Sequence, residues 1–296
     1  MYNLEQLRMF VESAELGSFS ACARKLGKVQ SAISQGIANL EIDLNIQLFD
    51  RTTRKPSLTP EGKQLFTYAE AVLRQTEELN TAVQAVERGD EAIIRLALDN
   101  ALFVPALGKI LQEFGETFPA TAIEVIYTPS TDVISHIKKQ RADLGLMFSD
   151  LSFKQDVQLG FIGHVPFHAV CNPVHALAKI ESVNVSDLIP HRQLVLRGEI
   201  AAGFDQFTRI SAEIWWANSF HAIEAMVKQG IGWAYIPCHL VDEAIKNKEL
   251  VQLPLSFDHK PWSLSVDLIR AKNQNMGTAQ SWLHERLTHL LDATDA

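Results

Sequence analysis

Residues 17–35, with the sequence GSFSACARKLGKVQSAISQ, decide the fold of the N-terminal region. Gly17 interrupts a preceding helical pattern, and Ser18 has a side chain suited to cap a second helix over residues 19–26. Gly27 can adopt the left-handed conformation that ends such a helix. A third helix follows at once, from about Val29 or Gln30 to residue 43. Two short helices joined by a tight glycine turn predict a helix-turn-helix.

The third helix has one apolar and one polar face. Its apolar positions recur at i, i+4, i+7 and i+11, which places them on one buried stripe: Ile33, Ile37, Leu40 and Leu44. Small polar side chains gather near its N-terminal end. Gln can pair with adenine through two hydrogen bonds, and Ser can bond bases or phosphates without bulk. The candidate DNA contacts here are Lys28, Gln30, Ser31, Ser34 and Gln35, although a plain helical bundle would also expose such a face.

The flanking segments support DNA binding. Upstream, an amphipathic helix is expected from the spacing of Leu4, Leu7, Phe10, Val11 and Ala14. Downstream, residues 48–58 predict two short strands around a basic tip, a wing, in which Arg51, Arg54 and Lys55 can reach phosphates or a narrow minor groove. The chain has a net charge of −8, but residues 24–63 carry seven basic and four acidic side chains. Such a local excess suits phosphate contact, and also occurs on many solvated surfaces.

Several short motifs of this region resemble the signature of the LysR-type transcriptional regulators. They keep the family's order and register over about 60 residues: Gly17-Ser18-Phe19-Ser20, Leu26, Gln30-Ser31-Ala32-Ile33-Ser34, Leu40-Glu41, Leu48-Phe49-Asp50-Arg51 and Leu58-Thr59-Pro60-Glu61-Gly62. The resemblance implies an α/β protein with a winged helix-turn-helix (residues 1–58), a long linker and dimerisation helix (59–89) and a two-lobed sensor domain like periplasmic binding proteins (90–296).

The chain departs from the family pattern at a few positions. Val29 occupies the usual Ser or Thr cap of the recognition helix, which costs about 1 kcal/mol without compensation. Gln35-Gly36 stands where a long polar pair is common, and Gly36 weakens a helix interior by about 1 kcal/mol relative to Ala. Cys22 replaces a family alanine and is expected to be structural. These departures affect the expected base preference, and DNA binding itself is still predicted.

A long helix is expected from Thr59 to about Arg88, where Gly89-Asp90 ends it. Thr59 is suited as the cap, Pro60 to the first turn and Glu61 to the helix dipole. A bulky row recurs every seven residues: Leu65, Val72, Leu79 and Val86. A row of smaller residues lies three positions earlier: Gly62, Ala69, Thr76 and Val83. This seam predicts pairing with a second copy, and the alternative is a helix that lies on its own domain.

From residue 93 onward, strands and helices alternate, which predicts βαβ units and a mostly parallel sheet. Strands are expected over residues 93–98, 122–127, 143–148, 165–171, 193–197, 232–236 and 262–270, with helices over residues 102–118, 131–140, 219–229, 237–246 and 278–291. The family resemblance implies two lobes joined near Gly163 and Ser265, with lobe I over about 90–163 and 266–296 and lobe II over about 164–265.

Ligands of such sheets bind beyond the carboxyl ends of the strands, against helix N-termini. Those positions predict these effector contacts: Asp99, Asn100, Ala101, Ser130, Thr131, Phe148, Arg197, Asn218 and Ser219. Helix starts favour a carboxylate or another small polar anion. Asp99 either opposes a purely anionic ligand, favouring an amino-acid-like or mixed polar metabolite, or caps the helix that follows it.

Catalytic and cofactor motifs are missing from the sequence: it contains no GxGxxG, P-loop, GxSxG or HExxH pattern. His164 and His168 lie in a strand-like segment, so they do not converge on a metal. Trp215-Trp216 can line a cleft, but core packing or a dimer contact is favoured. We therefore expect no enzyme activity, no cofactor and no metal site.

The chain is long enough for two or three domains, and no apolar run reaches the roughly 18 residues of a membrane span. The N-terminus lacks signal-peptide features, so we expect a cytoplasmic protein without a membrane partner. Expected partners are double-stranded DNA with an interrupted palindromic operator, a small polar metabolite and further copies of the chain (a homodimer, then a homotetramer), with RNA polymerase as a candidate. The alternatives are a redox sensor acting through Cys171 or Cys238 and a cleft-based solute-binding protein.

Overall fold

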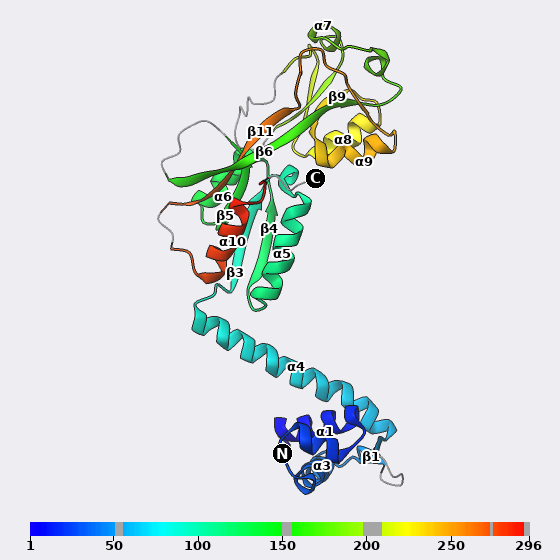
Figure 1. Cartoon of the computed structure of the whole chain (residues 1–296), viewed down its shortest axis with the longest axis vertical. Helices are drawn as coiled ribbons and strands as arrows, with labels where there is room; N and C mark the ends of the chain where they lie inside the picture. Colours follow the sequence, from blue (N-terminus) through cyan, green and yellow to red (C-terminus); the bar gives the residue numbers. More distant parts are fainter. Residues whose placement is uncertain (51–55, 150–155, 198–208, 273–274, 293–296) are drawn as a thin grey trace. The chain divides into compact units, whose positions relative to one another are not determined.

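The computed structural model describes residues 1–50, 56–149, 156–197, 209–272 and 275–292. The chain divides into two compact units, Met1–Gln84 and Ala85–Ala296 (Figure 1). Each unit has its own hydrophobic core. Among the described residues, no helix combines the length and apolarity that a membrane span requires.

The first unit contains the predicted helix-turn-helix and the start of the wing. Helices α1 (Leu4–Leu16), α2 (Phe19–Lys25) and α3 (Gln30–Leu44) precede the paired strands β1 (Phe49–Asp50) and β2 (Ser57–Leu58). Gly17 and Gly27 have φ angles of 58° and 63°, and the Ser18 hydroxyl accepts from the Ala21 N–H, so the predicted turns and cap are confirmed. The tip that carries Arg51, Arg54 and Lys55 lies outside the described residues.

Helix α4 (Pro60–Arg88) spans the predicted linker. The hydroxyl of Thr59 accepts from the Gly62 N–H at 2.8 Å, which confirms the predicted cap. Gly89, with φ of 75°, ends the helix, because its N–H bonds to the Val86 carbonyl and the Asp90 N–H to the Ala85 carbonyl.

The two ends of the predicted seam differ. Leu65 is half-buried and packs on the core of the first unit, as expected for a helix that lies on its own domain. Further along, Val72, Leu79 and Val86 are exposed by 44%, 63% and 79%. Gly62, the first member of the predicted row of smaller residues, faces the first unit instead of a second copy, because a Cβ atom there would overlap the Leu48 carbonyl oxygen. An uncovered apolar stripe therefore remains only on the later turns of α4.

Within the described residues, the second unit is built on one sheet of nine strands. Eight of them follow the order β4-β3-β5-β11-β6-β9-β7-β8, and β10 (Val251–Gln252) pairs with β6. One parallel group comprises β3 (Ile93–Leu98), β4 (Ala122–Tyr127) and β5 (Leu144–Phe148). The other comprises β7 (Gln193–Leu196), β8 (Ile214–Ala217) and β9 (Trp233–Pro237).

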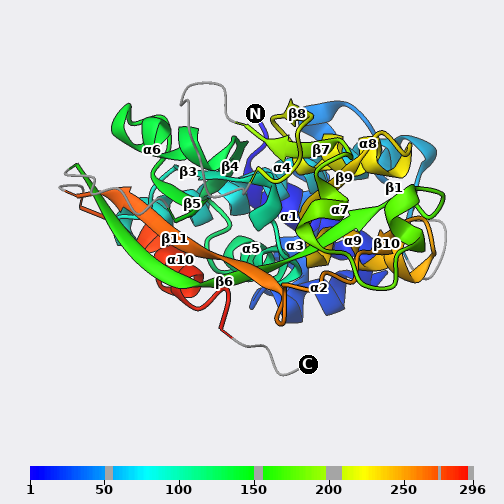
Figure 2. The same ribbon diagram turned by 90° about the horizontal axis from the view of Figure 1, so that it is seen from above.

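Two long strands, β6 (Val157–Cys171) and β11 (Trp262–Ala271), run antiparallel between these groups (Figure 2). The prediction of a mostly parallel sheet is therefore wrong, because the strands that cross between the lobes run in opposite chain directions. β6 also begins eight residues before the expected strand. Gly163, with φ of 135°, and a register shift at Val266/Asp267 lie at or beside the positions where the lobes were expected to join.

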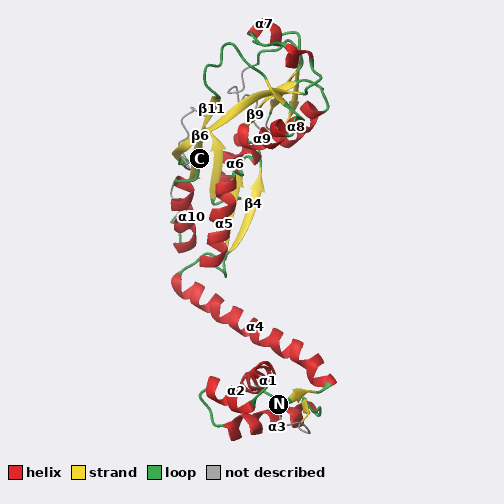
Figure 3. Cartoon of the chain, turned by 45° about the vertical axis from the view of Figure 1, so that its right-hand side comes forward, coloured by secondary structure: helices red, strands yellow, loops and turns green. Residues whose placement is uncertain are grey.

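The helices of the second unit pack on this sheet (Figure 3). In lobe I, the short helix η1 (Asn100–Leu102) leads into α5 (Pro105–Thr117), followed by α6 (Ser130–Lys138) and, near the C-terminus, α10 (Thr278–Thr288). Phe114 and Phe118 of the α5 segment each lie 5.9 Å from the Trp282 ring of α10. Lobe II contributes η2 (Ala176–Lys179), α7 (Val185–Leu188), α8 (Phe220–Lys228) and α9 (Cys238–Lys246).

Strand β8 was not expected from the sequence. Trp215 and Trp216 are exposed by 45% and 49% on this edge strand, so the core-packing interpretation of the pair is wrong. The Arg192 guanidinium lies 3.9 Å from the centroid of Trp215, and that of Arg197 lies 5.5 Å from Trp216. Stacking on arginine lets the rings stay partly solvated.

Candidate functional site

Helix α3 presents the two faces that its sequence predicts. Ile33, Ile37 and Leu40 are completely buried against α1 and α2. On the opposite side, Gln30, Ser31 and Gln35 are exposed, and Ser34 is half-buried. The first unit therefore offers a helix whose buried stripe anchors it and whose polar face is open to a macromolecular partner.

Local hydrogen bonds orient the two glutamines of this face. The Ser20 hydroxyl of α2 donates to the Gln30 Oε1 atom at 2.7 Å. The Gln35 Nε2 atom donates to the Asn39 Oδ1 atom, one turn further along α3, at 2.8 Å. Sequence reasoning missed both partners, although Asn39 lies one helical turn from Gln35; Ser20 lies on another helix, where no local pattern links it to Gln30. Both amides are thus held in place by neighbouring side chains.

The predicted contact Lys28 already has an ionic partner. Its Nζ atom lies 2.5 Å from Glu5 Oε1 of α1. Both side chains are exposed, and such surface pairs contribute about 0–1 kcal/mol. Lys28 can therefore exchange Glu5 for a phosphate at small cost.

Two departures from the family pattern have structural counterparts. Val29 precedes α3 without a side-chain cap and is 67% exposed, so its side chain does not replace the missing hydroxyl. Gly36 faces the buried side chain of Met9, and a Cβ atom at position 36 would overlap the Met9 sulfur. The glycine that weakens the helix interior thus permits a close crossing of α1 and α3.

Glu41 connects α3 to the segment that leads into β1. Its Oε1 atom accepts from the backbone N–H groups of Leu48 at 2.8 Å and Phe49 at 3.1 Å. Both of these residues are completely buried. The sequence analysis used Glu41 only as part of a family motif, and its pairing with backbone groups seven and eight residues away carries no local signal.

In lobe I, four of the predicted effector residues form one buried network. Asp99 accepts from the Ala101 N–H at 3.1 Å, the Ser130 N–H at 3.0 Å and the Ser130 hydroxyl at 2.8 Å. The Ser130 hydroxyl in turn accepts from the Phe148 N–H at 3.0 Å. Burial raises the pKa of the Asp99 carboxyl, while the bonds from Ala101 and Ser130 act in the opposite direction. Asp99 therefore caps η1, the second of its two predicted roles.

A hydrogen bond joins lobe I to lobe II beside this network. The Asn100 Nδ2 atom donates to the Ser219 hydroxyl, at the start of α8, at 2.8 Å. His239 lies near the start of α9. Burial lowers the pKa of His239, and the backbone of Ala101 opposes the shift. Sequence reasoning predicted Asn100 and Ser219 and missed His239.

The other predicted effector residues lie near these contacts in the fold but outside the buried network. Thr131 is half-buried at the start of α6, and its hydroxyl bonds to Asp132. Arg197 and Asn218 are exposed at the carboxyl ends of β7 and β8. Neither α6 nor α8 receives a side-chain cap from its own N-cap residue, Pro129 or Ser219. At the start of α6, the Asp99 carboxylate supplies the acceptor instead, through its bond from the Ser130 N–H.

The cysteines are poorly placed for redox chemistry. Burial raises the pKa of Cys171 to about 11 and that of Cys238 to about 12, so little thiolate forms at neutral pH. The β6–β9 register pairs Phe167 with Pro237 and Cys171 with Trp233, which places Cys171 about 13 Å along the strands from Pro237, the residue before Cys238. A disulfide needs Cα atoms within about 7 Å. In the described part of the chain, no cluster of His, Cys, Asp and Glu has a geometry suited to a metal ion.

Comparison with known proteins agrees with this architecture. Residues 4–63 match the family model of bacterial regulatory helix-turn-helix proteins of the lysR family. Residues 87–292 match the LysR substrate binding domain. The first match covers the helix-turn-helix and wing region, called the head below, and the second covers the two-lobed unit.

Full-length relatives have the same organisation. The chain is 30% identical to the HTH-type transcriptional regulator AceR of Acinetobacter baumannii, over 95% of each chain. Full-length BenM superposes with a TM-score of 0.53 at 22% identity, over 96% of this chain and 95% of that one. CrgA, a LysR-type regulator from Neisseria meningitidis, superposes with a TM-score of 0.51 at 22% identity, over 98% of both. These relatives are regulators rather than enzymes, and the chain belongs to the LysR family of transcriptional regulators.

Proposed function

We propose that the chain is a sequence-specific regulator, acting on DNA in the cytoplasm, whose DNA contacts respond to a small polar molecule bound between the two lobes of its sensor domain. In this proposal residues 1–58 bind DNA, residues 59–89 link and dimerise, and residues 90–296 sense the effector. The observation that carries it is the hydrogen bond from Asn100 to Ser219, which joins a strand end of lobe I to a helix start of lobe II.

The polar face of α3 supports DNA reading by Gln30, Ser31, Ser34 and Gln35, with Arg51, Arg54 and Lys55 on the phosphates. Nuclease protection of genomic fragments by the purified full-length chain would identify the operator. Gln30→Ala should then lose discrimination between operator and scrambled DNA. Gln64→Ala, which removes an exposed glutamine from α4, is the matched control.

The wing has a different signature. Arg54→Ala should weaken binding to operator and scrambled DNA alike and reduce the salt dependence by about one unit of slope per lost phosphate contact. An unchanged salt slope would show that Arg54 does not contact phosphate.

The polar groups beside the lobe junction favour one class of effector. Asp99 is occupied by Ala101 and Ser130, so it does not select a cationic ligand. Donors come from the start of α8 and from Asn100, Ser219 and Arg197, which favours a small carboxylate or a neutral ligand rich in acceptors. Binding at the lobe junction should couple to DNA contacts with about 1–3 kcal/mol, as is typical of such switches.

A thermal-shift screen of small carboxylates and amino acids on the full-length chain tests this site. A stabilising compound should lose its effect in Asn100→Ala/Ser219→Ala and retain it in the control Ser263→Ala, which removes an exposed hydroxyl from β11. A shift that survives in the double variant would place the ligand elsewhere. If no metabolite shifts the melting temperature but oxidation of the protein does, the result would instead support the redox alternative.

The exposed stripe of α4 supports a homodimer, and the sensor domains would build a tetramer. Leu79→Asp places a charge on the stripe and should halve the mass measured by sedimentation. Asn80→Asp adds the same charge one residue away on an exposed position and should leave the mass unchanged. An unaltered mass and operator affinity in Leu79→Asp would contradict pairing through α4.

A further inference from the structure

Helix α10 is capped by a residue from the other end of the domain. The Glu91 carboxylate accepts from the Gly277 N–H at 2.7 Å and from the Gln280 N–H at 3.2 Å. These donors belong to the N-cap and the first turn of α10, which begins at Thr278. Glu91 lies between α4 and β3, 186 residues before Gly277. A carboxylate in this position also interacts favourably with the helix dipole.

The space for this carboxylate depends on the glycine. Gly277 has no side chain with which to cap α10 itself. A Cβ atom at this position would lie 2.6–2.9 Å from the Glu91 carboxylate, too close to coexist with it. The φ angle of Gly277 is −75°, which any residue can adopt, so the absence of a side chain serves the contact rather than the backbone.

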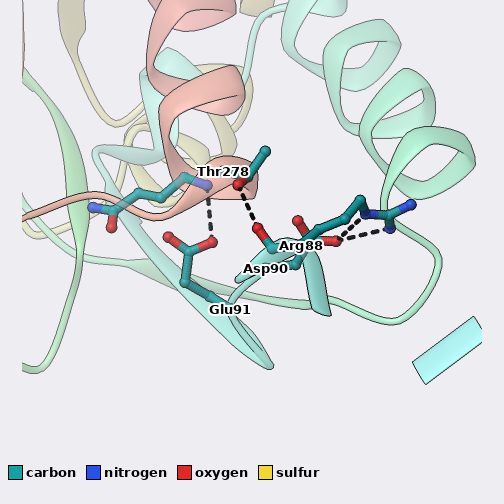
Figure 4. Close-up of polar contacts among 5 residues, drawn as sticks. Arg88, Asp90, Glu91 and Thr278 are labelled. Carbon is teal, nitrogen blue, oxygen red and sulfur yellow. Dashed lines mark hydrogen bonds and ion pairs between the residues drawn. The ribbon is translucent and has the colours of Figure 1, made fainter. Parts of the chain in front are cut away.

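A second bond runs in the opposite direction. The Thr278 hydroxyl donates at 3.1 Å to the carbonyl of Arg88, the last residue of α4 (Figure 4). The Arg88 guanidinium also bonds to the Asp90 carboxylate at 2.8 Å, beside Glu91. The end of the linker helix and the start of α10 therefore satisfy each other's terminal backbone groups, which helix ends otherwise leave without intrahelical partners.

From this junction, polar contacts continue into the sheet of lobe I. The Gln280 Nε2 atom donates to the Asp143 carbonyl at 3.4 Å. The Asp143 carboxylate accepts from the Arg95 N–H of β3 at 2.7 Å. Strands β3 and β5, which Asp143 connects at this end, lead to Asp99 and Phe148 at their opposite ends. The linker end is thus attached to the same two strands that carry the network beside the lobe junction.

We propose that Glu91 is the positioning residue that fixes the last turn of α4 to lobe I, so that a rearrangement of the lobes is transmitted to the linker helix. This role rests on the proposed function, because it assigns to the sensor domain the part that responds. Removing the carboxylate should free the linker end without unfolding the lobe, since α10 keeps its apolar packing through Phe114, Phe118 and Trp282.

Hydrogen exchange of the full-length chain, read by mass spectrometry, tests the cap. In Glu91→Ala, amides of residues 277–283 should exchange about five- to tenfold faster, the size expected for a lost helix cap. Glu87→Ala removes an exposed glutamate one turn earlier on α4 and should change nothing there. Gly277→Ala should reproduce the effect, and the double variant Glu91→Ala/Gly277→Ala should add little, because both act on one contact.

Transmission is tested with the operator fragment defined by nuclease protection. Its binding should alter exchange over residues 277–283 in the wild type and not in Glu91→Ala, while the affinity for the fragment stays within about twofold. The role is overturned if exchange is unaltered in Glu91→Ala, if the fragment has no effect on residues 277–283 of the wild type, or if its effect persists in the variant. Failure of any fragment to bind would instead contradict the proposed function, and the exchange rates without DNA would still decide the cap.

Discussion

Replacing Gly62 with alanine adds one methyl group where the backbone of the preceding segment lies against the first turn of α4. The new Cβ atom would overlap the Leu48 carbonyl oxygen, and a backbone atom cannot rotate away as a side chain can. The start of α4 must therefore move off β1. That movement breaks the bonds from the Thr59 N–H to Leu48 at 3.0 Å, from the Thr59 hydroxyl to Gln47 at 2.7 Å and from the Gly62 N–H to Thr59 at 2.8 Å.

The expected magnitude follows from these terms. Three hydrogen bonds contribute about 1 kcal/mol each, so about 3 kcal/mol is lost. Alanine in a helix recovers about 1 kcal/mol relative to glycine. The net destabilisation of the first unit is about 2 kcal/mol, or a fall in Tm of about 10 °C for a unit of this size.

Gly36→Ala is the matched control, because it offers the same helical gain but meets the flexible Met9 side chain instead of backbone. Its effect should stay within about 1 kcal/mol of zero. Every tryptophan lies in the second unit, so their fluorescence reports that unit alone: residues 215, 216, 233, 262 and 282. Gly62→Ala should shift the melting seen by far-UV circular dichroism and leave the fluorescence transition unchanged. Equal or higher stability in Gly62→Ala would refute the reasoning.

Three further results are expected. Val29→Ser should stabilise the first unit by about 1 kcal/mol in thermal melts by supplying the missing cap, and no gain would mean that another group already satisfies the start of α3. Glu41→Ala should destabilise the wing by about 2–4 kcal/mol and abolish operator binding in a titration, because it strands two buried N–H groups; full affinity would argue against this tie. Because burial lowers the pKa of His239, the unfolded chain takes up a proton that the folded chain does not, so stability falls as the pH drops below the ordinary histidine pKa of 6.5. His239→Gln should flatten this pH dependence in thermal melts from pH 7 to 5, and an unchanged slope would exclude His239 as its source.

Much of the head could be predicted from the sequence, because its elements depend on contacts that are close along the chain. The glycine turns at Gly17 and Gly27, the caps at Ser18 and Thr59 and the stripe of Ile33, Ile37 and Leu40 all act within a few residues. The same holds for strands β3, β4 and β5, which apolar runs and intervening helices define. For these parts the local pattern and the tertiary structure favour the same conformation, which is typical of natural sequences.

Sheet topology depended on pairings that no local pattern encodes. Strands β6 and β11, about 100 residues apart, run antiparallel between two parallel groups. Apolar periodicity indicates that a segment is extended, but says nothing of which neighbour it pairs with or in which direction. For the same reason, the outward position of Trp215 and Trp216 on an edge strand followed only from the order of strands.

The candidate sites divide in the same way. The sequence by itself determined which residue types lie at the helix starts and strand ends, including Gln30, Asn100 and Ser219. Only the tertiary structure decided what each polar group bonds: Asp99 turns inward to Ser130, and Glu91 caps a helix that begins 187 residues later. A buried carboxylate takes whichever donors the packed chain brings within about 3 Å, and that choice is made by long-range packing rather than by the residues beside it in the sequence.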